Sequence, residues 1–94
     1  MFEIKRGDGG ILYLSGRLDA SQVEAAEKVL ATTSGLTVAD LSALDYISSA
    51  GIGLLLKTLK RLADSGGQLK IVNATPRVKA VFHYAGLDTL LPLE

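Results

Sequence analysis

Apolar and polar positions alternate along the chain with two different periods, that of a strand and that of a helix. Residues 2–6 (FEIKR) alternate apolar and charged side chains, and a second apolar run, residues 11–14 (ILYL), follows the glycine-rich segment 7–10. Two strand-like runs joined by glycine and aspartate are typical of a β-hairpin. The next residues, 16–19 (GRLD), are expected to leave the sheet.

A first helical period follows, with apolar residues at Val23, Ala26, Val29 and Leu30. These positions share one face of a helix. Ser21 and Glu24 have the spacing of a capping box, in which each side chain bonds a free backbone N–H of the first turn. This helix is expected to end in the segment 32–35 (TTSG).

The strongest helical period comes after a third predicted strand, residues 36–41. Apolar residues of that strand occupy both odd and even positions, which point to opposite faces of a sheet. This predicts burial on both faces of the strand. The helix that follows carries Ile52, Leu55, Leu56, Leu59 and Leu62 on one side and Lys57, Lys60 and Arg61 on the other. Its start therefore falls within residues 48–51 (SSAG), and glycines 66–67 end it.

The last third of the chain predicts one more strand and one more helix. Residues 69–72 form the strand, and the order strand–helix–strand requires a right-handed crossover between parallel strands. Thr75 followed by Pro76 predicts a helix start. Its core-facing residues are expected to be Val78, Val81, Phe82 and Ala85, with Gly86 at the end. The tail after Gly86 fits either a helical turn or an edge strand. We expect a single α/β domain over residues 1–94, with a mixed sheet of four to five strands and three to four helices.

Composition narrows the class of protein. Ten basic residues balance ten acidic ones, which argues against nucleic-acid or lipid-surface binding. There is no cysteine and His83 is the only histidine, so no metal or cofactor site is predicted. No run approaches the ~20 apolar residues of a membrane span, and the N-terminal residues lack the apolar run of a signal peptide. We therefore expect a cytoplasmic protein with no insertion into the membrane.

Patterns for catalysis are incomplete. Neither Ser48 nor Ser49 has both flanking glycines of a nucleophile elbow, since Ser49 has Gly51 after it but Ile47 before it. Gly51 and Gly53 are not followed by the third glycine of a dinucleotide fingerprint, because Leu56 takes its place. We expect no enzyme activity.

Three carboxylates could still gather around the serine loop. Asp19, Asp40 and Asp45 would then hold a metal or act as acid and base. The favoured interpretation is that Asp40 and Asp45 accept hydrogen bonds from loop N–H groups.

The two serines have two competing interpretations. One of them is the N-cap of the central helix, or one of them is a phosphoacceptor whose phosphate would meet the positive end of the helix dipole. Gly51 and Gly53 would leave the first turn open to a partner, and an exposed Leu54 beside the serines would suit a docking surface. The residues alone leave both interpretations open.

Three segments carry a resemblance to a known family: GRLDA (16–20), DLSALDYISSAGIGLLL (40–56) and TPRVKAVFHYAGL (75–87). Together with the order of elements they resemble the STAS domain, and within it the stand-alone anti-sigma factor antagonists. The resemblance implies a partner, an anti-sigma factor with serine-kinase activity, which binds the unphosphorylated protein and releases it after phosphorylation. It also implies a serine phosphatase that reverses the mark.

The resemblance also implies site residues. The family's acceptor lies two residues before the glycine, which is Ser49 here, with Ser48 as second choice because it stands where many members carry aspartate. The expected partner-binding residues are Asp19, Asp40, Ser48, Gly51, Gly53 and Leu54. The alternative function is that of an accessory STAS subunit of a lipid-transport ATPase, which would work without phosphorylation.

Overall fold

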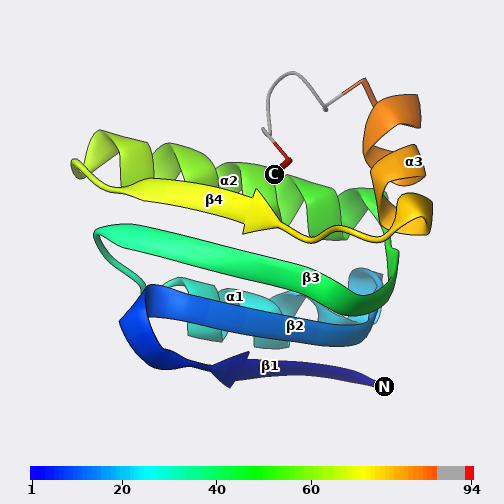
Figure 1. The fold of residues 1–94 in the computed structure, drawn as a ribbon, viewed down its shortest axis with the longest axis horizontal. Helices are drawn as coiled ribbons and strands as arrows, with labels where there is room; N and C mark the ends of the chain where they lie inside the picture. Colours follow the sequence, from blue (N-terminus) through cyan, green and yellow to red (C-terminus); the bar gives the residue numbers. More distant parts are fainter. Residues whose placement is uncertain (87–92) are drawn as a thin grey trace.

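The computed structural model describes residues 1–86 and 93–94. Its centre is a four-stranded sheet in the order β1 (Phe2–Arg6), β2 (Ile11–Leu18), β3 (Leu36–Ile47) and β4 (Gln68–Val72). β1 and β2 are antiparallel, while β2, β3 and β4 run parallel (Figure 1). The helices are α1 (Val23–Leu30), α2 (Ser49–Asp64) and α3 (Pro76–Tyr84), with two short 3₁₀ turns, η1 (Asp8–Gly10) and η2 (Ala20–Gln22). The predicted α/β class, the hairpin and the parallel pairing of β3 with β4 are confirmed.

β2 continues through the glycine that was expected to end it. Gly16 has φ +86°, and a Cβ on it would lie 1.6 Å from the Met1 carbonyl oxygen. The pairing of β2 with β3 shifts register on both sides of this region, as at a β-bulge. Glycine is therefore needed because the strand bulges and the start of β1 passes close by, and the prediction that residues 16–19 leave the sheet is wrong as far as Leu18.

β3 is also longer than predicted. It extends through Leu44 and Ile47, both fully buried, and pairs with β2 as far as Leu18 opposite Ile47. Asp40 consequently lies in the middle of the strand, where it was expected at the end.

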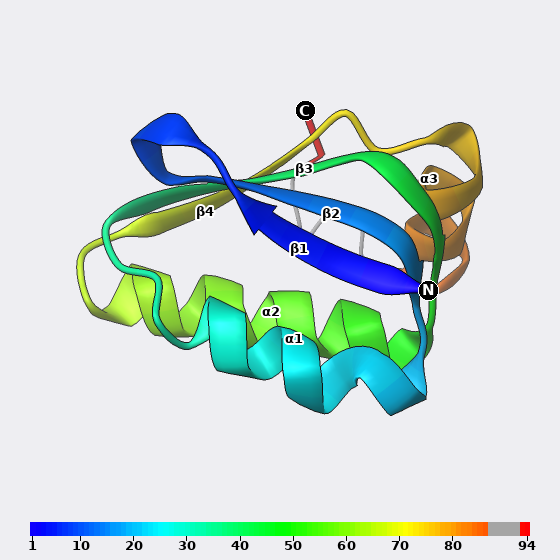
Figure 2. The same ribbon diagram turned by 90° about the horizontal axis from the view of Figure 1, so that it is seen from below.

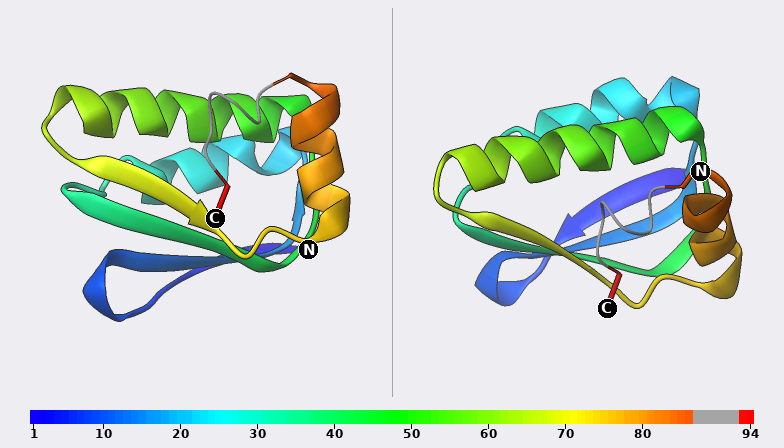
Figure 3. Two further views of the ribbon diagram at one scale, coloured as in Figure 1. Left: turned by 45° about the horizontal axis from the view of Figure 1, so that its top comes forward. Right: turned by 90° about the horizontal axis from the view of Figure 1, so that it is seen from above.

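Within the described residues, the helices α1 and α2 cover one face of the sheet and leave the other open. Figure 2 shows α1 and α2 side by side beneath it, and the two views of Figure 3 agree. The opposite face carries a row formed by Lys5, Tyr13, Asp40 and Val72 in register across the four strands. Tyr13 in this row is 46% exposed. The prediction that β3 is buried on both faces is therefore wrong. It was made because apolar residues on an open face of a sheet give the same pattern in the sequence as buried residues.

The helix starts agree only in part with the predicted caps. Thr75 caps α3, its hydroxyl accepting from the Val78 N–H at 3.3 Å, and Pro76 is the first helical residue, as predicted. No capping box forms at α1, because its N-cap is Gln22 without a side-chain hydrogen bond. Ser21 instead donates to Asp19, the N-cap of η2.

The end of the chain meets β4. Leu93 forms a parallel bridge with Ile71, and the Glu94 N–H donates to the Ile71 carbonyl at 2.7 Å. This favours the edge-strand alternative at Leu93, while the expectations for residues 87–92 lie outside the described residues. Ala85 is exposed, so its predicted place in the core is wrong, whereas Val78 and Phe82 are fully buried.

Candidate functional site

A single residue, Ser48, connects β3 to α2. Its N–H donates to the Leu18 carbonyl at 2.9 Å, its carbonyl accepts from the Ile52 N–H at 2.9 Å, and its hydroxyl accepts from the Gly51 N–H at 3.1 Å. Ser48 is thus the N-cap of the helix, and its own backbone is extended. The hydrogen bond to Leu18 ties the start of α2 to the end of β2, and the other two form the first turn of the helix.

Ser49 is the first residue of α2 and its side chain is exposed. Among the described residues, no hydrogen bond involves its hydroxyl group. The first N–H groups of an α-helix have no partner within the helix and carry the positive end of its dipole. A negative charge placed on the Ser49 oxygen would therefore lie in a favourable field.

The two glycines near the start of α2 have different structural roles. A Cβ at Gly51 would lie 2.9 Å from both Ile47 Cγ1 and Leu18 Cγ, so this buried glycine lets α2 approach the sheet. A Cβ at Gly53 would meet nothing within 4 Å, and the residue is exposed. The expectation of backbone open to a partner holds for Gly53 and is wrong for Gly51.

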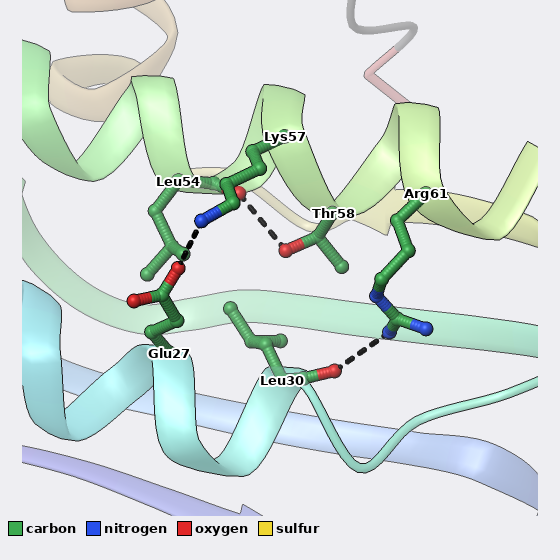
Figure 4. A network of polar contacts seen from close by, with 6 residues as sticks. All are labelled: Glu27, Leu30, Leu54, Lys57, Thr58 and Arg61. Carbon is green, nitrogen blue, oxygen red and sulfur yellow. Dashed lines mark hydrogen bonds and ion pairs between the residues drawn. The ribbon is translucent and has the colours of Figure 1, made fainter.

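Leu54 is only 4% exposed, so the expectation of an exposed leucine at a docking surface is wrong. It lies on the flank of α2 that faces α1 (Figure 4). On the same flank Lys57 pairs with Glu27, and Arg61 donates to the Leu30 carbonyl at 2.9 Å. The neighbouring helix, which the period of α2 alone does not reveal, buries this side chain.

Asp19 lies at the start of α2, because Leu18 pairs with Ile47 and Asp19 follows it. Its carboxylate accepts from the Ser21 hydroxyl at 2.6 Å and from the Ser21 N–H at 3.1 Å. The hydroxyl hydrogen bond is the main reason why the pKa of Asp19 lies below its ordinary value. Asp19 is thus an ionised neighbour of Ser48 and Ser49.

Asp40 lies away from the serines, on the open face of the sheet. Its carboxylate accepts from the Ser42 N–H at 2.9 Å and from the Asn73 side-chain amide at 3.0 Å. Partial burial raises its pKa, but these hydrogen bonds together outweigh burial and the pKa is lowered. The three predicted carboxylates do not converge, and the described part of the chain holds no group of three acidic or histidine side chains that could bind a metal.

A further pair of side chains lies at the same end of the sheet and has no signal in the sequence. The Arg17 guanidinium lies 4.5 Å from the centre of the Tyr46 ring, a cation–π contact between residues in register on β2 and β3. We call the region formed by residues 17–19, 46–50 and 53 the serine edge. It comprises the ends of β2 and β3 and the exposed start of α2.

Comparison with known proteins identifies the family. A family model described as "Mlab, STAS domain" matches residues 2–92. The chain belongs to the STAS domain family. The resemblance seen in the sequence is therefore confirmed. Within the described residues, no helix has the length and apolar character needed to cross a membrane.

Relatives of this chain carry the name anti-sigma factor antagonist. BtrV of Bordetella bronchiseptica, a candidate anti-sigma factor antagonist, is 33% identical over 88% of this chain and 75% of its own length. An anti-sigma F factor antagonist of Lysinibacillus sphaericus is 30% identical over 82% of this chain and 70% of its own. The crystal structure of an anti-sigma factor antagonist from Mycobacterium paratuberculosis superimposes with a TM-score of 0.79 at 28% identity, covering 99% of this chain and 83% of that one.

Proposed function

We propose that this STAS domain is an anti-sigma factor antagonist whose binding to its partner is switched by phosphorylation of Ser49. The observation that carries the proposal is the contrast between two adjacent hydroxyls. The Ser48 hydroxyl caps the helix, whereas the Ser49 hydroxyl is on an exposed residue and has no hydrogen bond among the described residues. The names of the two relatives support an anti-sigma factor as the partner. Ser48 is the second choice as acceptor, since its phosphorylation would require breaking the hydrogen bond by which its hydroxyl caps the helix.

In the unphosphorylated state the serine edge docks on the anti-sigma factor. Gly53 offers open backbone, and Ser48, Ser49 and Asp19 offer polar groups at the same place. Gly51 and Leu54 act from beneath this surface, by seating α2 against the sheet and against α1. Asp40 is too far along β3 to share the contact, so we assign it no part in the switch.

Phosphorylation changes the charge of this surface and leaves the fold intact. A phosphoserine carries about −1.5 to −2 charges at neutral pH. The helix start stabilises that charge within the domain. In the complex, the phosphate would lose its hydration next to the ionised Asp19 carboxylate. Burying an unpaired charge costs several kcal/mol, which is enough to abolish binding of micromolar affinity.

The partner is an anti-sigma factor with serine-kinase activity, and a serine phosphatase restores the binding form.

The test measures binding of the purified domain to that anti-sigma factor by calorimetry. We expect Ser49→Asp to weaken binding about a hundredfold or more, while Ser49→Ala binds and resists phosphorylation. Gln68→Glu, which adds a negative charge at an exposed position at the amino end of β4, is the control and should bind normally.

Two results would overturn the proposal. One is normal binding by Ser49→Asp with an unchanged circular dichroism spectrum. The other is phosphate incorporation in Ser49→Ala that disappears only in Ser48→Ala, which would move the acceptor to Ser48.

The alternative, an accessory subunit of a lipid-transport ATPase, is favoured by one observation, the description of the matching family model as "Mlab, STAS domain". It predicts that an ATPase co-purifies with the chain and that Ser49→Asp and Ser49→Ala bind it equally. Identification of the co-purified protein by mass spectrometry separates the two functions.

A further inference from the structure

A cavity of about 250 Å³ lies at the end of the sheet opposite the serine edge. It opens where β1 ends and where β2 and β3 begin, against the loop that follows α1. Its lining residues are Arg6, Gly7, Gly10, Ile11, Leu12, Thr32, Thr33, Ser34 and Thr37. One cation and four hydroxyl side chains line it, and no carboxylate does, so the cavity favours a negatively charged occupant.

Thr37 shows that the cavity is a built feature of the fold. The residue is 2% exposed, on the face of β3 that the helices cover, and its hydroxyl has no hydrogen bond among the described residues. Yet none of those residues has a side-chain polar atom that is both fully buried and unpartnered. The hydroxyl must therefore reach the solvent of the cavity it lines, where it can donate to a ligand.

Arg6 supplies the charge. Its guanidinium donates to the Thr32 hydroxyl, which in turn donates to the Val29 carbonyl at 2.7 Å. These hydrogen bonds hold the guanidinium at the cavity. An arginine side chain has five N–H groups, and those not used here have no partner among the described residues. Ser34 adds a second hydroxyl without a hydrogen bond among the described residues. Arg6, Ser34 and Thr37 thus converge as donors from three different elements.

The nearby end of α1 does not oppose an anion as strongly as a bare helix C-terminus would. The last carbonyls of α1 carry partial negative charge. Here Thr33 donates to the Leu30 carbonyl at 2.6 Å, and the Arg61 guanidinium bonds the same carbonyl and the Thr33 carbonyl and hydroxyl. A second guanidinium therefore stands directly behind the cavity wall. Asp8 lies on the adjacent turn η1 and is not among the lining residues.

We infer that this cavity is a binding site for a small phosphate-type oxyanion, held by the Arg6 guanidinium and the Thr37 hydroxyl. Charge-assisted hydrogen bonds from arginine and hydroxyl donors are the usual means of holding such a group. The volume lies just below the range of ~300–1,000 Å³ typical of ligand pockets, which restricts the occupant to a free ion or a small phosphomonoester.

The test is a titration of the ¹⁵N-labelled domain, followed by NMR, with inorganic phosphate and separately with glycerol phosphate, at constant ionic strength. Saturable shifts are expected at the amides of Gly7, Gly10, Ser34 and Thr37. Arg6→Gln and Thr37→Val should each weaken binding about tenfold, since each removes a donor to a charged ligand. Thr37→Ser keeps the hydroxyl and should restore affinity.

Arg77→Gln is the matched control, because it removes the same charge from an exposed position on α3. Equal weakening by Arg6→Gln and Arg77→Gln would mean non-specific attraction and would overturn the site. Absence of saturation with both ligands would overturn it too. Tighter binding of glycerol phosphate than of phosphate would support the site and identify a phosphomonoester as its ligand. The reverse order would support it as a site for the free ion.

Discussion

At the scale of single residues, the two glycines near the start of α2 make a matched pair. A Cβ at Gly51 would crowd Ile47 and Leu18, whereas a Cβ at Gly53 has open space. Overpacking costs ~1–3 kcal/mol, while replacing a helical glycine by alanine gains up to ~1 kcal/mol. We expect Gly51→Ala to lower the free energy of unfolding and Gly53→Ala to raise it, as measured by urea denaturation. A rise in both variants would contradict the close packing of α2 on the sheet.

A second prediction at this scale concerns Asp40. Its pKa is lowered in the folded protein, so the ionised form contributes stability that is present above the unfolded value, near 3.8, and is lost as the pH falls through the folded pKa. Asp40→Asn keeps the shape without the charge and should lose less stability than the wild type below about pH 4. Urea midpoints measured between neutral and acidic pH test this. Identical acid profiles for the two proteins would mean that the Ser42 and Asn73 hydrogen bonds do not favour the ionised form.

The residue scale also explains which parts of the site could be predicted. Ser48 and Ser49 lie in a segment whose helical period and resemblance both point to a helix start, and this placement is confirmed. Leu54 was misplaced because the period of α2 describes only the side packed on the sheet. Its second buried flank, with Leu54 and Thr58, depends on α1, more than twenty residues earlier in the sequence.

At the scale of elements, an arginine of α2 caps the C-terminal end of α1. Arg61 donates to the Leu30 carbonyl, the Thr33 carbonyl and the Thr33 hydroxyl at 2.9–3.0 Å, and so serves the C-terminal end of α1 from the surface of α2. Arg61→Met should lower the free energy of unfolding by ~1–3 kcal/mol, because carbonyls of a neighbouring helix lose charged donors. Thermal unfolding followed by circular dichroism measures it.

Lys57→Met is the matched control for that prediction. It removes the ion pair with Glu27 on the same flank of α2, between side chains that are 72% and 42% exposed. Such an exposed pair contributes ~0–1 kcal/mol. If the lysine variant were as destabilised as the arginine variant, the capping role of Arg61 would be wrong.

Elements were predicted well where a turn residue bounded them and less well where a strand ran on through an irregular sequence. Thr75 and Pro76 set the start of α3, and its N-cap was placed correctly. Gly16 looked like a strand end because glycine usually interrupts a strand, whereas here it accommodates a bulge against Met1. The extension of β3 past Leu41 was not predicted for the same reason, since its pairing partner is the part of β2 around and beyond Gly16.

At the scale of the whole molecule, the parallel strands separate two polar surfaces. Their carboxyl ends meet the start of α2 at the serine edge, and their amino ends frame the cavity of Arg6 and Thr37. The longest dimension of the domain is 30 Å, and β3 runs from one surface to the other (Figure 1). Between them lie packed apolar side chains such as Leu41 and Leu44, both fully buried, and no hydrogen-bonded chain of side chains connects the two ends among the described residues.

This separation predicts that the two surfaces act independently. Sites more than ~7–10 Å apart without shared partners couple by no more than ~0.3–0.5 kcal/mol. Arg6→Gln should therefore leave binding to the anti-sigma factor unchanged, Ser49→Asp should leave phosphate binding unchanged, and the double variant should show both defects at their single-variant sizes. Calorimetric titration of the four proteins with each ligand completes the cycle. A coupling well above that limit would require β3 or α2 to have two arrangements that both ligands select, because one rigid arrangement cannot transmit it.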